Sequence, residues 1–159
     1  SELITLLKKS GLKAVKVGVE SADTDVMKAE KRYTVSQDQQ LTKIRELEEN
    51  NIQVSSMFII GFPSDNEESI RKTINYAITL NTTYAQFSIW TPYPGTPVFE
   101  EYKNKITNNN FENFDQYSLV YKHNKFEPFE VRNFLDKAYS KYYSRISWLF
   151  KYFKSFLHA

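Results

Sequence analysis

The chain contains no cysteine among its 159 residues and only two histidines, His123 and His158. Without cysteine, the polypeptide can form no disulfide, has no thiolate nucleophile and cannot ligate an iron–sulfur cluster with its own side chains. Neither histidine has a second ligand at metal-binding spacing. The sequence therefore predicts no metal ligand in this chain.

Long apolar runs and a strong net charge are lacking as well. No apolar stretch reaches the roughly 18 residues that a membrane span requires, and the first residues do not follow the pattern of a signal peptide, so a cytoplasmic location is expected. The net charge of +2 gives no indication of nucleic acid as a partner. With 41% hydrophobic and 25% charged residues, the composition is that of a globular domain.

Three short phrases each close an apolar run that is typical of a buried β-strand. The runs are 14–19, 52–60 and 84–90, and the phrases are Gly18-Val19-Glu20-Ser21, Gly61-Phe62-Pro63 and Thr91-Pro92-Tyr93-Pro94-Gly95-Thr96-Pro97. Each interval between them holds one amphipathic helix, which is the crossover that parallel strands need. The three phrases are therefore expected on one rim, the carboxyl end of the strands, where barrels of this kind carry their ligand sites.

Capping patterns mark where the two crossover helices begin. Ser36 with Gln39 and Ser64 with Glu67 both have the spacing of a capping box. An earlier helix with Leu3, Leu6 and Leu7 on one face is expected to end at Gly11.

Several rim residues have side chains suited to binding a small molecule. Glu20 and Ser21 offer acceptors and a hydroxyl for a ribose or an amine, and Arg32 could pair with a ligand carboxylate. Gly61 would let a flat ligand approach the backbone. Other interpretations remain open, because Arg32 also fits a basic solvent-exposed face and a Gly-x-Pro phrase also fits a turn without any ligand.

Taken together, the phrases resemble the radical S-adenosylmethionine enzymes, and most closely the branch that often carries an upstream cobalamin-binding domain. The resemblance runs from about Leu3 to Lys105. The phrases that carry it are Gly18-Val19-Glu20-Ser21, Lys31-Arg32-Tyr33-Thr34, Gly61-Phe62-Pro63 and Pro92-Tyr93-Pro94-Gly95-Thr96. It implies an α/β fold, the C-terminal half of a partial (β/α)6 TIM-like barrel that begins just before the fourth strand.

The resemblance also implies a set of cofactor contacts. Glu20 would bind the ribose hydroxyls of S-adenosylmethionine, Arg32 its carboxylate, and the adenine would lie between the ends of the second and third strands of this chain. The full set is Glu20, Ser21, Arg32, Ile59, Gly61, Phe62, Pro63, Trp90 and Pro92. No catalytic residue is assigned in this chain.

The family holds a [4Fe-4S] cluster with three cysteines after its first strand, and no such residues are present here. The resemblance thus implies a fragment of an enzyme whose missing N-terminal half supplies the cluster. The complete enzyme would cleave S-adenosylmethionine reductively for radical chemistry on an unknown substrate, with cobalamin-dependent methyl transfer or rearrangement among the outcomes. Any cobalamin would belong to an absent upstream domain, and the isolated chain is expected to be inactive.

Three regions are expected: the half-barrel over 1–106, an asparagine-rich connection over 107–127, and an aromatic helical extension over 128–159. A long amphipathic helix from Pro128 carries aromatic and basic residues, which favours packing on the open barrel edge but also leaves peripheral membrane contact open. The alternative function is a noncatalytic half-barrel that binds a membrane or a partner. His123 lies beyond the barrel phrases and is expected to have no influence on cofactor binding.

Overall fold

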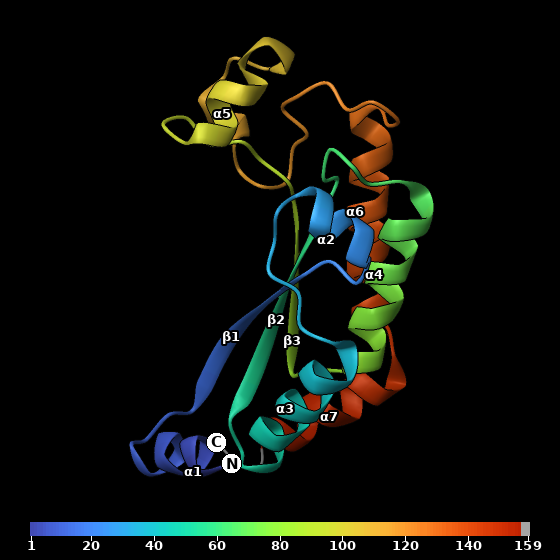
Figure 1. Ribbon diagram of the computed structural model, residues 1–159. Coiled ribbons are helices and arrows are strands. Elements are labelled where there is room, and N and C mark those ends of the chain that lie inside the picture. Colours follow the sequence, from blue (N-terminus) through green and yellow to red (C-terminus); the bar gives the residue numbers. More distant parts are fainter. Residues whose placement is uncertain (157–159) are drawn as a thin grey trace.

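The computed structural model describes residues 1–156 and contains three strands that alternate with helices (Figure 1). The first part of the chain comprises α1 (Glu2–Lys9), β1 (Ala14–Glu20), α2 (Thr24–Ala29), α3 (Gln37–Glu49), β2 (Gln53–Ile60), α4 (Glu67–Leu80) and β3 (Tyr84–Ile89). The second part comprises α5 (Pro97–Tyr102), 3-10 turns at Lys103–Lys105 and Phe111–Asn113, α6 (Pro128–Tyr143) and α7 (Ile146–Phe156).

The strands form one parallel sheet in the order β1-β2-β3, which confirms the predicted topology. The three predicted phrases therefore lie at the same end of the sheet. Near that end the register of β1 against β2 shifts between Gly18 and Glu20, and Glu20 has a left-handed φ of 67°. This bulge skips Val19 and places Glu20, the last residue of the strand, opposite Phe58.

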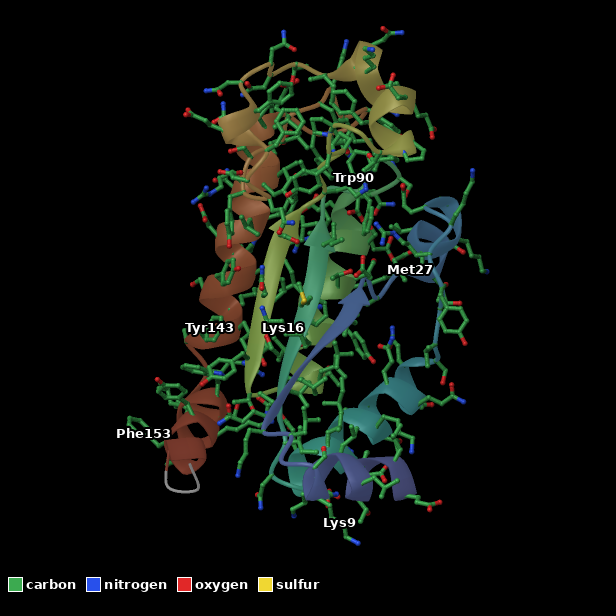
Figure 2. All side chains as sticks on the ribbon, turned by 90° about the vertical axis from the view of Figure 1, so that its left-hand side faces the viewer. Lys9, Lys16, Met27, Trp90, Tyr143 and Phe153 are labelled. Carbon is green, nitrogen blue, oxygen red and sulfur yellow. The ribbon has the colours of Figure 1, made fainter. Side chains whose placement is uncertain are left out.

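The two faces of the sheet have different surroundings. In β2, Val54, Ser56, Phe58 and Ile60 are buried, whereas the alternate residues are only half-buried. The helices α3, α4 and α6 lie on the side of the buried residues (Figure 1), and Figure 2 shows the opposite face of the sheet with no helix across it. The arrangement is that of a partial TIM-like fold whose inner face is open.

The helix boundaries agree with the sequence at two points and differ at a third. Ser36 caps α3 by accepting the N–H of Gln39, and Gly11 follows α1 with a φ of +90°. The capping box predicted for Ser64 and Glu67 is wrong: Asn66 caps α4, paired with Ser69. Ser64 instead hydrogen-bonds to Glu30, because the strand-end turn extends two residues further than the spacing suggested.

Helix α6 covers the outer edge of β3 with two tyrosines. The hydroxyl of Tyr143 accepts the N–H of Ala85 and donates to its carbonyl at 3.0 and 2.6 Å. Tyr139 does the same at Phe87, at 3.1 and 2.9 Å. Tyrosines four residues apart on a helix are about 6 Å apart along its axis, close to the repeat of two residues in a strand, so the spacings match. The expected packing on the open edge is confirmed for α6.

The C-terminal helical segment is divided into α6 and α7, where the sequence predicted one long helix. Arg145 lies at the division, and its guanidinium donates to the carbonyls of Tyr142 and Ile78. A side chain that binds the carbonyls at a helix end stabilises a stop there. The polypeptide then turns into α7. There the Trp148 ring packs against Tyr143, and its Nε1–H donates to the Thr83 carbonyl.

Candidate functional site

A cavity of about 370 Å³ opens at the carboxyl ends of β2 and β3, a size within the usual range for small-molecule sites. Three of the predicted contacts line it, namely Arg32, Ile59 and Trp90. The remaining lining residues are Glu30, Ser88, Ile89, Thr91, Tyr93, Thr96, Val98 and Gln116. The cavity therefore combines an aromatic and aliphatic wall with a cation and a carboxylate.

Glu20 and Arg32 form an ion pair beside this cavity, with Arg32 Nη1 3.4 Å from Glu20 Oε2. The Glu20 side chain is 25% exposed and that of Arg32 is 45% exposed. Glu20 Oε2 is itself buried and has no hydrogen-bond donor. The carboxylate folds back over Gly18, where a Cβ would lie 2.9 Å from Glu20 Oε1, so this glycine provides room for the carboxylate.

The short helix α2, which the sequence did not indicate, sets the position of Arg32. The Arg32 N–H donates to the Met27 carbonyl at 2.8 Å and the Lys31 N–H to that of Lys28 at 3.1 Å. Lys31 has a left-handed φ of 54° between these bonds. This is a Schellman ending of a helix, and it directs the next residue back toward the sheet. The guanidinium carbon of Arg32 then lies 5.9 Å from the centre of the Phe62 ring.

The Gly61-Phe62-Pro63 phrase forms the turn that follows β2, and most of it faces the interior. Gly61 has a φ of +75°, and an added Cβ would lie 3.0 Å from Val131 of α6. Only glycine meets both conditions without strain. Phe62 is fully buried and Pro63 partly buried, so this turn would contact a ligand mainly through its backbone.

Trp90 and Pro92 continue from the end of β3. The Trp90 N–H donates to the Ile60 carbonyl at 2.9 Å, and the indole packs edge-on against Tyr102 and Tyr121. Pro92 is buried. The two strand ends are thus joined by a hydrogen bond, and the Trp90 side chain forms one wall of the cavity.

Ser21 lies apart from the cavity, although its sequence position suggested a ligand contact. Its hydroxyl is buried, contacts that of Thr73 in α4 at 3.1 Å and accepts the N–H of Asp23 at 3.1 Å. These bonds fasten the loop after β1 to α4. The predicted residues at the cavity are Arg32, Ile59 and Trp90, and Glu20 is linked to them through its pair with Arg32.

Sequence reasoning missed four residues that hold the turn after β2. Asp65 accepts the Phe62 N–H at 2.9 Å, and Glu30 accepts both the N–H and the hydroxyl of Ser64. Tyr121 and His123 donate to the carbonyls of the same turn. Burial raises the pKa of Asp65 to about 6, although hydrogen bonds from Ser69 and Phe62 oppose the increase. Only the proximity of Asp65 to the phrase could have indicated any of these contacts.

The position of His123 in the sequence suggested a place remote from the site. In the structure it lies next to the turn after β2. It is buried, and its Nε2 lies 2.9 Å from the Phe62 carbonyl oxygen. Among the residues that the structure describes, no group of three histidine, cysteine, aspartate or glutamate side chains could hold a metal ion. Since the sequence has no cysteine, these residues do not fit an iron–sulfur cluster.

The structure is that of an α/β protein with a cavity at the carboxyl ends of its parallel strands. Comparison with known families gives a match to the radical SAM superfamily over residues 1–77. This match and the relatives described below support a fragment of a radical SAM protein.

Three similar proteins extend the comparison beyond that region. The chain is 31% identical to an uncharacterised methyltransferase of Pyrococcus horikoshii over 91% of this chain and 32% of that protein. It is 29% identical to the bacteriochlorophyllide d C-12(1)-methyltransferase of Chlorobaculum tepidum over 80% of this chain and 27% of that protein. It is 26% identical to the anaerobic magnesium-protoporphyrin IX monomethyl ester cyclase of Rubrivivax gelatinosus over 89% of this chain and 25% of that protein. The chain thus spans between a quarter and a third of these relatives.

Proposed function

We propose that this chain forms the S-adenosylmethionine-binding half of a longer radical SAM enzyme. The observation that carries the proposal is the Glu20–Arg32 pair next to a cavity walled by Ile59 and Trp90. These are a carboxylate, a guanidinium and an apolar slot, and they complement the ribose, the carboxylate and the adenine of the cofactor.

The carboxylate of S-adenosylmethionine would bind Arg32. This guanidinium lines the cavity, is 45% exposed and makes one long contact with Glu20 at 3.4 Å. Arginine presents several N–H donors in a planar arrangement that suits a carboxylate. The Schellman ending of α2 holds the Arg32 backbone, and the guanidinium carbon lies 5.9 Å from the centre of the Phe62 ring.

The ribose hydroxyls would donate to Glu20. Its Oε2 atom is buried and accepts no hydrogen bond, and its pair with Arg32 Nη1 at 3.4 Å leaves acceptor capacity unused. Two adjacent hydroxyls of a ribose can satisfy both oxygens of such a group. The adenine would then lie between the backbone from Ile59 to Gly61 and the residues from Trp90 to Pro92.

The remaining parts of the enzyme would come from outside this chain. A segment with three cysteines would hold the [4Fe-4S] cluster, which supplies the electron for cleavage of the cofactor. The names of two relatives are those of methyltransferases, and this supports methyl transfer as one outcome. Any cobalamin would bind to a separate domain. A cytoplasmic location fits this chemistry, which requires a reduced cluster.

The test is cofactor binding by the longer protein with its cluster reconstituted. Glu20→Gln and Arg32→Met should each weaken S-adenosylmethionine binding by about one to two decades, the equivalent of roughly 1.5 to 3 kcal/mol for a charge-assisted bond. Lys28→Ala is the matched control, because it removes an exposed cation of α2 that pairs with Asp25. Wild-type affinity in both Glu20→Gln and Arg32→Met would refute the assignment.

A second candidate function is favoured by the exposed face of α7. Ile146, Phe150 and Phe153 are between 65% and 74% exposed, and they fall on one side of the helix, opposite Trp148. Residues 137–159 carry five lysines and arginines and no acidic residue. Such a helix is suited to lie on an anionic lipid surface. No helix in residues 1–156 is long and apolar enough to cross a membrane.

Sedimentation with vesicles tests this second candidate. The chain should sediment with vesicles that contain phosphatidylserine and remain in solution with neutral vesicles. Phe150→Ser should abolish the sedimentation, whereas Phe129→Ser, at another exposed phenylalanine that lies in α6, should have no effect. Equal sedimentation of the two variants would remove the case for a lipid-binding face.

A further inference from the structure

The turn after β2 is held by a segment that lies outside the region matched to the family, residues 1–77. The Tyr121 hydroxyl donates to the Gly61 carbonyl at 2.8 Å, and His123 Nε2 lies 2.9 Å from the Phe62 carbonyl oxygen. Both side chains are buried. Two successive carbonyls of one turn are therefore bound by residues about 60 positions further along the chain.

The hydrogen bonds of His123 define which of its nitrogens carries the proton. Nδ1 lies 3.0 Å from the Lys125 N–H donor and 3.2 Å from that of Phe126. A nitrogen that accepts from two N–H groups carries no proton, so in the neutral ring Nε2 is the donor to Phe62. Burial lowers the pKa of His123, which favours this neutral form. The ring is also stacked on Phe126, with centroids 4.9 Å apart.

Tyr121 contacts the other wall of the cavity as well. Its ring packs edge-on against Trp90 with centroids 4.9 Å apart, and Tyr102 contacts both rings. The segment that carries Tyr121 is anchored by backbone bonds on either side, from Thr107 to Val120 and from Lys122 to Lys105. Figure 2 shows Trp90 below this part of the chain, at the upper end of the sheet.

We propose that Tyr121 and His123 are positioning residues for the adenine end of S-adenosylmethionine. They hold the backbone turn at Gly61 and Phe62 and the indole of Trp90, the two sides between which the adenine is proposed to lie. This inference rests on the proposed function. It adds that the 119–126 segment, which no family phrase includes, contributes to cofactor affinity without touching the cofactor.

Two substitutions of His123 separate this role from a local structural one. Asparagine can place its oxygen near the position of Nδ1 and keep the bonds from Lys125 and Phe126, but it cannot reach Phe62. Glutamine can place its amide nitrogen near the position of Nε2 and keep the bond to the Phe62 carbonyl. If His123 only shapes its own turn, His123→Asn should keep the ligand affinity of the wild type and His123→Gln should lower it. The proposal predicts the opposite order.

The experiment measures two ligands on the reconstituted longer protein, S-adenosylmethionine and 5′-methylthioadenosine, which keeps the adenine and ribose but lacks the carboxylate. His123→Asn and Tyr121→Phe should weaken both ligands about five- to tenfold, the effect of one lost neutral hydrogen bond. His123→Gln should stay within about twofold of wild type. Thermal unfolding of each variant checks that it is folded. If a substitution of His123 prevents folding, Tyr121→Phe, which keeps the aromatic ring, still tests the proposal.

Arg32→Met serves as the reference for the proposed function. If it loses affinity for S-adenosylmethionine while His123→Asn and Tyr121→Phe bind both ligands like wild type, the positioning role is refuted and the cofactor site stands. An affinity order with His123→Asn above His123→Gln also refutes the role. If wild type binds neither ligand, the proposed function and this inference fall together.

Discussion

Asp65 is a buried carboxyl group that holds the turn after β2 through the Phe62 N–H and faces the carboxylate of Glu30 across this turn. Its pKa of about 6 lies above the ordinary value of 3.8, mainly because burial disfavours the charged form. The turn therefore holds a charge at pH 7 at a cost to the free energy of unfolding. The hydrogen bonds from Phe62 and Ser69 offset part of that cost.

A pH series on Asp65→Asn should reveal this cost. Because the folded pKa exceeds the unfolded one, the folded state takes up the proton first as the pH falls from 7 toward 4. The free energy of unfolding of the wild type should then rise relative to the variant by about 2 to 3 kcal/mol. Urea unfolding at several pH values measures the difference, and contributions from other groups such as His123 cancel in the comparison. A difference that stays constant over this range would contradict the account.

At the scale of residues, the sequence could predict those that belong to family phrases. Glu20 and Arg32 form a pair next to the cavity, and Ile59 and Trp90 line it, as the phrases indicated. Tyr121 and His123 could not be predicted, because they contact Gly61 and Phe62 from 60 residues away and belong to no phrase. The predicted ligand contact of Ser21 stays a prediction, and in the structure its hydroxyl contacts that of Thr73.

At the scale of elements, the edge of β3 is closed by side chains of a helix. Tyr139 and Tyr143 satisfy the N–H and carbonyl groups of Phe87 and Ala85, which would otherwise be available to another strand. The next outward N–H, that of Ile89, donates to the Gln116 carbonyl at 2.6 Å. The sheet is therefore closed to further strands on this side.

Removing the two hydroxyls should weaken α6 packing and open this edge. Tyr139→Phe and Tyr143→Phe should each lower the free energy of unfolding by about 1 to 3 kcal/mol, since each leaves a backbone N–H and carbonyl unpaired. Tyr33→Phe is the control, because the Tyr33 side chain is 88% exposed. Urea unfolding followed by circular dichroism gives the values. Losses no larger than that of the control would mean that the tyrosine rings alone hold the helix to the sheet.

Periodicity predicted the strands and the crossover helices well, because a buried face repeats along each element. It failed for α2, which has six residues and no stripe of its own, and for the division between α6 and α7. That division depends on Arg145 binding the Ile78 carbonyl, a contact between distant parts of the chain. The aromatic spacing of α7 suggested burial, yet Phe150 and Phe153 are exposed.

At the scale of the whole molecule, the parallel order of the strands brings all three phrases to one rim, as the sequence predicted. In the part of the chain that the structure describes, the edge of the sheet at β1 and the inner face of the sheet are uncovered. Within residues 1–156, β1 pairs only with β2, and Figure 2 shows the inner face without a covering helix. In a longer barrel enzyme these surfaces would meet the strands that precede β1.

The chain by itself should accordingly associate. Sedimentation velocity at rising concentration should show dimers or larger species, because an unpaired strand edge and a half-buried sheet face favour contact between copies. The longer protein should show less association and a higher Tm under the same conditions. A chain that stays monomeric at high concentration with a Tm equal to that of the longer protein would argue against an open half-barrel.

The central claim is that Arg32 and Glu20 bind different parts of S-adenosylmethionine. The most direct measurement compares S-adenosylmethionine with 5′-methylthioadenosine on the reconstituted longer protein. Arg32→Met should lower the affinity for S-adenosylmethionine by about one to two decades and change that for 5′-methylthioadenosine by no more than about twofold. Glu20→Gln should lower both affinities. If Arg32→Met weakens the two ligands equally, or if Glu20→Gln affects neither, the groups have been assigned to the wrong parts of the cofactor and the account is contradicted.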